Sequence, residues 1–179
     1  DIWTAGNDAL RVMQPAADED FEIEVKFESE PTQKYQMQGL LIEQDAENFL
    51  RLDFYSDGGQ LRLFAARFVG GAPTTLINQS IVSSPLLYLR LTRQGDTWTL
   101  QYADDGASWT ALSSFTHALS VSSAGVFAGN TGGNPAYTAE VDYFFNTFDP
   151  IVPEDGLLCA PEETFSLTSS VLGAGAVLR

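Results

Sequence analysis

The chain has 179 residues, of which 44% are hydrophobic, so it is long enough to bury one sizeable core. Its 24 acidic residues outnumber its 9 basic residues and leave a formal net charge of −15. Such a charge repels nucleic acid phosphates and anionic lipid headgroups, so we expect neither nucleic acid nor a membrane surface as a partner. The sequence also contains no run of 18 apolar residues, and we expect no membrane insertion.

Cys159 and His117 are the only cysteine and the only histidine of the chain. An internal disulfide, a cysteine-based zinc site and an iron–sulfur cluster are therefore excluded. A Ser/His/Asp triad would have to use His117, which lies in the turn-like stretch from Ser113 to His117. We assign His117 no catalytic role on this ground.

Apolar residues at every second position predict a half-buried strand from Phe21 to Phe27. The same period predicts strands at 38–43, 48–55, 61–68, 86–93, 97–103, 124–129 and 139–148. Glycine-containing turns such as Asp57-Gly58-Gly59 and Gln94-Gly95-Asp96 separate several of them. Trp98 falls on an apolar strand face and is expected in the core. No segment keeps a helical period, so we predict an all-β, antiparallel two-sheet sandwich.

The composition changes after Asp149. Three prolines and four acidic residues follow within 150–163, and the stretch from 164 to 178 is rich in Ser, Ala, Gly and Val. We therefore expect one sandwich domain at 1–149, with 150–179 as a linker and tail toward a neighbouring module.

Four stretches carry a resemblance to a known superfamily. They are Gln38-Gly39-Leu40-Leu41-Ile42 through Asn48-Phe49-Leu50-Arg51-Leu52, residues 89–98 ending in Gly95-Asp96-Thr97-Trp98, residues 104–109, and Ala139-Glu140-Val141-Asp142-Tyr143-Phe144. Together they resemble the bacterial concanavalin A-like lectin/glucanase superfamily over about residues 15–149. More narrowly, the chain is similar to the lectin-like "regulation of enolase protein" homologues and to the C-terminal sandwich of some β-xylosidases.

This resemblance implies a jelly roll with one concave sheet. It also implies an extracellular or cell-surface module, appended to other modules of a secreted glycoside-degrading or adhesive protein. The stretch from Asp104 to Trp109 additionally resembles most of an Asp-box, in which Asp104 would bind backbone amides and Trp109 would pack; Tyr102 stands where the box has serine.

The glucanases of that superfamily carry catalytic carboxylates as Glu-x-Asp-x-x-Glu on one strand. Glu140 and Asp142 match the first two positions, but the third is Phe145, which cannot donate a proton. We therefore expect no enzymatic activity.

A better candidate site lies on the opposite face of the middle strands. If Leu50, Leu52 and Phe54 enter the core, the residues between them face outward. Sugar recognition needs an aromatic face and polar groups that make paired hydrogen bonds. The residues that supply these groups are Arg51, Asp53, Tyr55, Arg62 and Phe64, joined by Asn130 and Tyr137 of the glycine-rich loop that includes Gly132, Gly133 and Asn134.

Two hypotheses of function follow. The first is a non-catalytic carbohydrate-binding module whose partner is a polysaccharide or glycan. The second is a structural or adhesion spacer without a small ligand, in which an arginine and an aspartate of this face form a cross-strand ion pair and a loop covers the aromatic residues. Trp3 either plugs the sandwich or sits exposed. No cofactor is expected with certainty; a structural calcium ion is compatible with the carboxylates present, but no spacing assigns its ligands.

Overall fold

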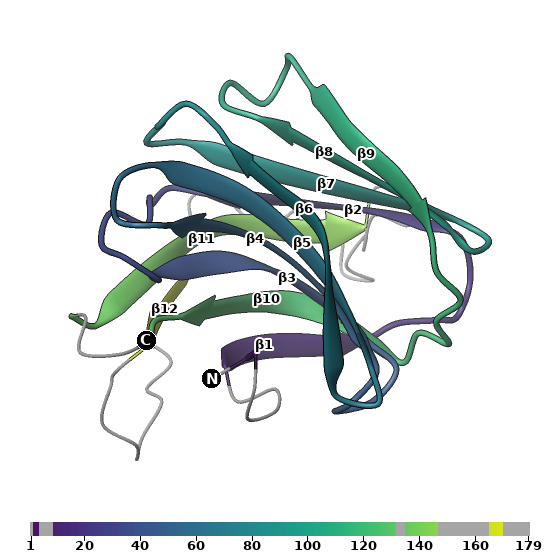
Figure 1. The fold of residues 1–179 in the computed structure, drawn as a ribbon. Helices are drawn as coiled ribbons and strands as arrows, with labels where there is room; N and C mark the ends of the chain where they lie inside the picture. Colours follow the sequence, from purple (N-terminus) through teal and green to yellow (C-terminus); the bar gives the residue numbers. More distant parts are fainter. Residues whose placement is uncertain (1, 4–8, 132–134, 147–164, 170–179) are drawn as a thin grey trace, which may run out of the picture.

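The computed structural model describes residues 2–3, 9–131, 135–146 and 165–169. Every regular element in these ranges is a β-strand, and all strand pairs are antiparallel. The strands form two six-stranded sheets that pack face to face (Figure 1). The all-β, two-sheet sandwich predicted from the sequence is confirmed.

The sheet that carries the candidate site is called sheet A, and its strand order is β1-β10-β3-β4-β5-β6. Its strands are β1 (Leu10–Pro15), β10 (Ser123–Gly129), β3 (Met37–Glu43), β4 (Phe49–Ser56), β5 (Leu61–Val69) and β6 (Ala72–Ser80). Strands β3 to β6 follow one another along the chain as successive hairpins, whereas β10 arrives from far along the sequence and lies between β1 and β3.

The opposite sheet, sheet B, has the order β12-β11-β2-β7-β8-β9. Its strands are β12 (Phe165–Ser169), β11 (Tyr137–Asn146), β2 (Phe21–Phe27), β7 (Leu87–Gln94), β8 (Thr97–Ala103) and β9 (Thr110–Thr116). The crossings between the two sheets bring residues that are distant in sequence into one core.

The main core lies between the sheets. Side chains alternate between the two faces of each strand, and those that point toward the other sheet enter this core. Strand β2 directs Phe21, Ile23, Val25 and Phe27 into this core, as its period predicts. Trp98 is fully buried there and donates from Nε1 to the backbone oxygen of His117 at 2.8 Å. Since buried indole N–H groups need such a partner, the predicted core position of Trp98 is confirmed.

Four strands, β1, β6, β9 and β12, were not predicted from the sequence. No strand was predicted in the segments that form β1 and β6. The prediction of a turn-like stretch at 113–117 is wrong, because Ser113 to Thr116 belong to β9. Strands β6 and β9 are edge strands whose side chains are mostly exposed or half-buried, so their sequences need no alternating hydrophobic pattern.

The turn after β8 does not use the aspartate that the resemblance to an Asp-box predicted. Asp105, rather than Asp104, accepts hydrogen bonds from the backbone amides of Ala107 and Ser108, at 2.8 and 2.7 Å. Trp109 packs as expected, with its ring 3.8 Å from the guanidinium carbon of Arg90. The aspartate of the motif is thus shifted by one residue.

The division of the chain at residue 149 stays a prediction. Within 150–179 the structure describes only β12, which pairs with β11 at the edge of sheet B. Cys159 lies outside the described residues.

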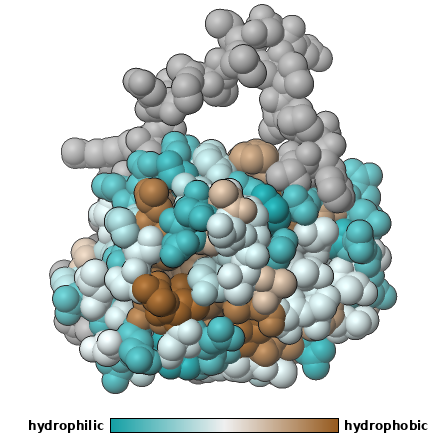
Figure 2. Space-filling model, turned by 90° about the horizontal axis from the view of Figure 1, so that it is seen from above, coloured by the Kyte–Doolittle hydropathy of each residue, from teal (hydrophilic) through white to brown (hydrophobic). Residues whose placement is uncertain are grey.

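One face of the molecule is mostly hydrophilic. Seen from above the view of Figure 1, teal and pale side chains predominate and hydrophobic ones gather in a confined area (Figure 2). Among the described residues, the exposed large hydrophobic side chains are Tyr35, Val69, Val82 and Phe145. No helix in the described part of the chain is long and apolar enough to cross a membrane.

Candidate functional site

The outer face of sheet A, the face turned away from sheet B, carries the residues that the sequence placed there. Leu50, Leu52 and Phe54 of β4 enter the main core, so Arg51, Asp53 and Tyr55 point the other way. The register sets Asp53 opposite Phe64 and Tyr55 opposite Arg62 on β5. The predicted juxtaposition of these two strands is therefore confirmed.

Arg51 and Asp53 form a buried ion pair within one strand. Nε and one terminal nitrogen of Arg51 donate to the two carboxylate oxygens of Asp53, at 2.7 and 2.9 Å. Asp53 is fully buried and Arg51 is 6% exposed. Burial raises the pKa of Asp53, while the adjacent guanidinium acts in the opposite direction. The two charges thus compensate each other beneath the surface, and the two side chains hydrogen-bond to each other rather than offering an open hydrogen-bonding site.

Aromatic rings enclose this ion pair. The guanidinium carbon of Arg51 lies 4.9 Å from the ring centre of Phe64 and 5.8 Å from that of Phe127. Phe49 and Phe68 stack beside them with centroids 4.1 Å apart. These residues form a second hydrophobic cluster on the outer face, separate from the main core.

A short N-terminal segment lies on this cluster. Ile2 is 4% exposed, and the partly exposed Trp3 packs edge-on against Phe64 and Phe68 with centroid distances of 5.7 and 5.8 Å. Trp3 therefore does not plug the space between the sheets but packs on their outside.

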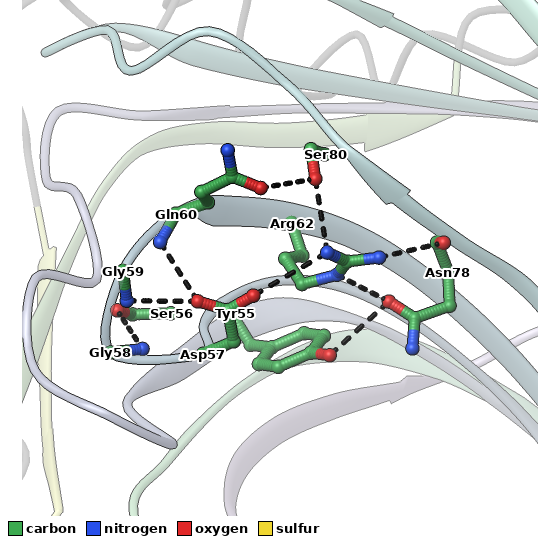
Figure 3. A network of polar contacts seen from close by, with 9 residues as sticks. All are labelled: Tyr55, Ser56, Asp57, Gly58, Gly59, Gln60, Arg62, Asn78 and Ser80. Atoms are coloured by element: carbon green, nitrogen blue, oxygen red, sulfur yellow. Dashed lines mark hydrogen bonds and ion pairs between the residues drawn. The ribbon is translucent and has the colours of Figure 1, made fainter.

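Next to this cluster, toward the end of β4, polar side chains reach the surface (Figure 3). The hydroxyl of Tyr55 donates to Oδ1 of Asn78 at 3.2 Å, and Nε of Arg62 donates to the same oxygen at 2.6 Å. Arg62 also donates to the backbone oxygen of Asn78 and to Oγ of Ser80, both at 3.0 Å. Four hydrogen bonds donated to acceptors on β6 thus hold the phenol and the guanidinium side by side.

The turn between β4 and β5 supports this network from one side. Asp57 accepts from the backbone amides of Gly59 and Gln60 at 2.9 and 2.8 Å, and its other oxygen lies 3.4 Å from Arg62. These amide hydrogen bonds hold the pKa of Asp57 below its ordinary value. Gly58 has a φ of 94°, which a glycine adopts without steric cost.

An open pocket of about 380 Å³ adjoins the same turn. It lies within the size range of small-ligand sites. It is lined by Glu30, Pro31, Thr32, Ser56, Gly58, Gly59, Gln60, Leu61, Ile81 and Ser83. The polar network and the pocket share Ser56, Gly58, Gly59 and Gln60, so they adjoin each other at this turn.

Tyr35 is a further aromatic residue at this end of the sheet. Its side chain is 42% exposed, and its backbone amide donates to the oxygen of Ser56 at 2.7 Å. Its φ of 64° is left-handed, a conformation that a tyrosine rarely adopts. Such strain concentrates at functional positions, which makes Tyr35 a candidate that sequence reasoning missed.

The two loop residues of the predicted site lie elsewhere. Tyr137 is buried in the main core, where its hydroxyl donates to Oε1 of Gln38 at 2.5 Å and burial raises its pKa. Asn130 donates from its side chain to the backbone oxygen of Pro135 at 3.0 Å. Gly132, Gly133 and Asn134 lie outside the described residues.

The partial glucanase motif does not form a pair of free carboxylates. Asp142 lies in a bulge of β11 and binds Nζ of Lys26 at 2.6 Å, whereas Glu140 is exposed. His117 is half-buried, and burial lowers the pKa of its imidazole. Among the residues that the structure describes, no group of three or more His, Cys, Asp or Glu side chains is arranged to hold a metal ion.

Asn78 and Ser80 were also missed from the sequence. Both lie on β6, two residues apart, and therefore share the face that carries Arg62. The signal that could have found them is Ile77, the buried residue of a strand whose other residues are exposed or half-buried.

Residues 5–145 match the family described as "Protein of unknown function (DUF1349)". No curated protein matches the sequence significantly.

Several solved structures share the fold. The chain is similar to the xylan β-1,4-xylosidase of Bacillus halodurans, with 20% identity, a TM-score of 0.65, and coverage of 78% of this chain and 30% of that one. For the GH43 protein BlXynB of Bacillus licheniformis the identity is 16%, the TM-score 0.63 and the coverage 76% and 32%. For the CBM2 module of the evolved Dit protein of Lactobacillus casei phage J-1 the values are 9%, 0.53, 66% and 60%.

These likenesses show that the chain shares the β-sandwich fold of these structures, and they confirm the fold-level resemblance to β-xylosidases. The chain spans about a third of the length of the two glycoside hydrolases.

Proposed function

This chain belongs to the family described as "Protein of unknown function (DUF1349)", and from that premise we propose that it is a non-catalytic carbohydrate-binding module. The observation that carries the proposal is the partly exposed polar network of Tyr55, Arg62 and Asn78 on the outer face of sheet A, beside an open pocket. A partly exposed phenol supplies an apolar ring face, and fixed amide and guanidinium groups supply hydrogen bonds.

The predicted residues take different roles in this proposal. Tyr55 and Arg62 contact the sugar directly, because both reach the surface. Phe64, Arg51 and Asp53 lie beneath, and they hold the face rigid instead of binding sugar themselves. Such preorganisation lowers the entropy lost when a ligand binds.

The rest of the proposal concerns context. We place the module outside the cell or on its surface, within a longer polypeptide that carries other modules. Similar sandwiches occupy about a third of the two glycoside hydrolase chains, which supports this arrangement. A structural calcium ion stays a prediction without assigned ligands.

Retention on polysaccharides tests the proposal. We expect the wild type to be retained on at least one member of a panel of insoluble xylan, cellulose, chitin and soluble glycans on an array, with and without calcium. Tyr55→Ala and Arg62→Ala should each lower retention by about tenfold or more, equivalent to about 1.4 kcal/mol.

Arg67→Ala is the matched control, because Arg67 lies on the same strand but on the opposite face from Arg62 and should leave retention unchanged. Thermal melts of all variants separate lost binding from lost folding. Retention of the wild type on no glycan would contradict the proposal and favour the spacer. The burial of Arg51, Asp53 and Phe64 is the observation that supports that second candidate.

A further inference from the structure

Resting on the proposed function, we infer that Trp3 is a second sugar-binding residue and that the ligand is a neutral oligosaccharide chain spanning Trp3 and Tyr55. The two rings are the ends of one aromatic strip along β5. A single sugar would contact only one of them, so the structure favours a chain of several sugar residues.

The strip is defined by contacts with one buried ring. Trp3 packs edge-on against Phe64 at 5.7 Å, and Tyr55 packs edge-on against the same ring at 5.8 Å. Phe64 is 7% exposed, whereas Trp3 and Tyr55 are both partly exposed. Two accessible aromatic side chains therefore flank one inaccessible ring, and their centres are at most about 12 Å apart.

Trp3 and Tyr55 lie on opposite sides of Phe64 along the strand. Trp3 also contacts Phe68, four residues further along β5, whereas Tyr55 pairs with Arg62, two residues back. A strand rises about 3.3 Å per residue, so the strip extends beyond the width of one sugar ring. Its Tyr55 end runs directly into the polar network and the pocket.

The segment that carries Trp3 is anchored. Ile2 is buried in the outer-face cluster, so the neighbouring Trp3 is held on sheet A and not left free in solvent. A side chain that is ordered before binding loses little entropy when a sugar ring stacks on it.

The charges around the strip favour a neutral ligand. The Arg51–Asp53 pair beneath it is neutral as a unit, and the half-buried Arg62 faces the carboxylate of Asp57. With a formal net charge of −15, the chain repels polyanionic glycans at long range.

Affinity as a function of chain length tests the inference. Xylose and its β-1,4 oligomers of two to five residues, and the corresponding glucose series, are titrated calorimetrically into wild type, Trp3→Ala, Trp3→Leu and Tyr55→Ala. We expect wild-type affinity to rise by about tenfold or more from the shortest to the longest bound oligomer. Trp3→Ala should abolish this rise while leaving the shortest bound sugar unaffected, and Tyr55→Ala should weaken every member.

Trp3→Leu keeps an apolar side chain on Phe64 and Phe68 but removes the flat ring, so it tests the stacking role should Trp3→Ala unfold. Trp109→Ala is the matched control, because Trp109 is partly exposed and packs on Arg90 of sheet B. An unchanged rise in a folded Trp3 variant overturns the inference and leaves the proposed function intact. Tighter binding of every oligomer by Trp3→Ala also overturns it, because Trp3 would then cover the site. Failure of the wild type to bind either series overturns the inference, and it contradicts the proposed function only if the wild type is also retained on no glycan of the wider panel.

Discussion

At the scale of single residues, the outer face of sheet A is organised around the ion pair of Arg51 and Asp53. Taking both charges out of water costs more than their attraction alone returns, unless further contacts compensate. Phe64 and Phe127 supply such contacts to the guanidinium, and Met37 accepts a further hydrogen bond through Sδ at 3.3 Å. Each member of the pair therefore depends on the other.

This dependence predicts that a double variant is more stable than the single variant that removes Asp53. Asp53→Ala should lower the free energy of unfolding by about 3–5 kcal/mol, because it leaves Arg51 charged and buried without its partner. Adding Arg51→Met removes that charge and should restore most of the loss. Urea denaturation at pH 7 measures both; equal or additive losses would contradict the interdependence of the pair.

At the scale of elements, two glycines allow the strands of sheet A to approach closely. A Cβ at Gly39 would lie 2.1 Å from the backbone oxygen of Leu52, and one at Gly125 would lie 2.0 Å from that of Val12. The obstacle in both cases is backbone, which cannot move aside as a flexible side chain can. These two positions therefore set the packing of β4 on β3 and of β1 on β10.

Gly39→Ala should consequently destabilise the protein by about 3 kcal/mol or more, because the added methyl group forces β3 away from β4. Gly59→Ala is the matched control: its Cβ would meet nothing closer than 3.6 Å, and we expect a change within about 1 kcal/mol. The midpoint of urea unfolding distinguishes the two. A Gly39→Ala variant as stable as Gly59→Ala would show that the sheet absorbs the methyl group.

At the scale of the whole molecule, the surplus of acidic residues opposes the compact state. Several carboxylates are paired, including Asp18 with Arg93 and Glu24 with Arg90, both at 2.6 Å. With 24 acidic and 9 basic residues, most carboxylates have no basic residue to pair with. Folding brings these charges together and raises their mutual repulsion.

Salt should therefore stabilise the protein. Raising NaCl from about 10 mM to about 1 M shortens the screening length from about 30 Å to about 3 Å and weakens this repulsion. We expect the Tm to rise by a few degrees in calorimetry at pH 7. A fall in Tm would mean that the ion pairs contribute more to stability than the repulsion removes; an equimolar uncharged osmolyte series controls for general solute effects.

Much of the fold followed from local pattern, because a half-buried strand must alternate. Strand β2 and the two faces of β4 were predicted correctly on this basis. Strands β6 and β9 were not, since an edge strand pairs through its backbone and accepts polar side chains on both faces. The partners of Arg62 on β6, Asn78 and Ser80, were missed for the same reason.

The sequence by itself thus determined the fold class, the faces of the central strands and the placement of Tyr55 beside Arg62, because these depend on the two-residue period of a strand and on hairpin pairing. Only the tertiary structure decided that Arg51 and Asp53 are buried, that Tyr137 belongs to the main core, and that Trp3 lies against Phe64. Whether a side chain on the outer face of a sheet is buried depends on which distant segment covers that face. The local sequence pattern of a strand carries no information about that segment.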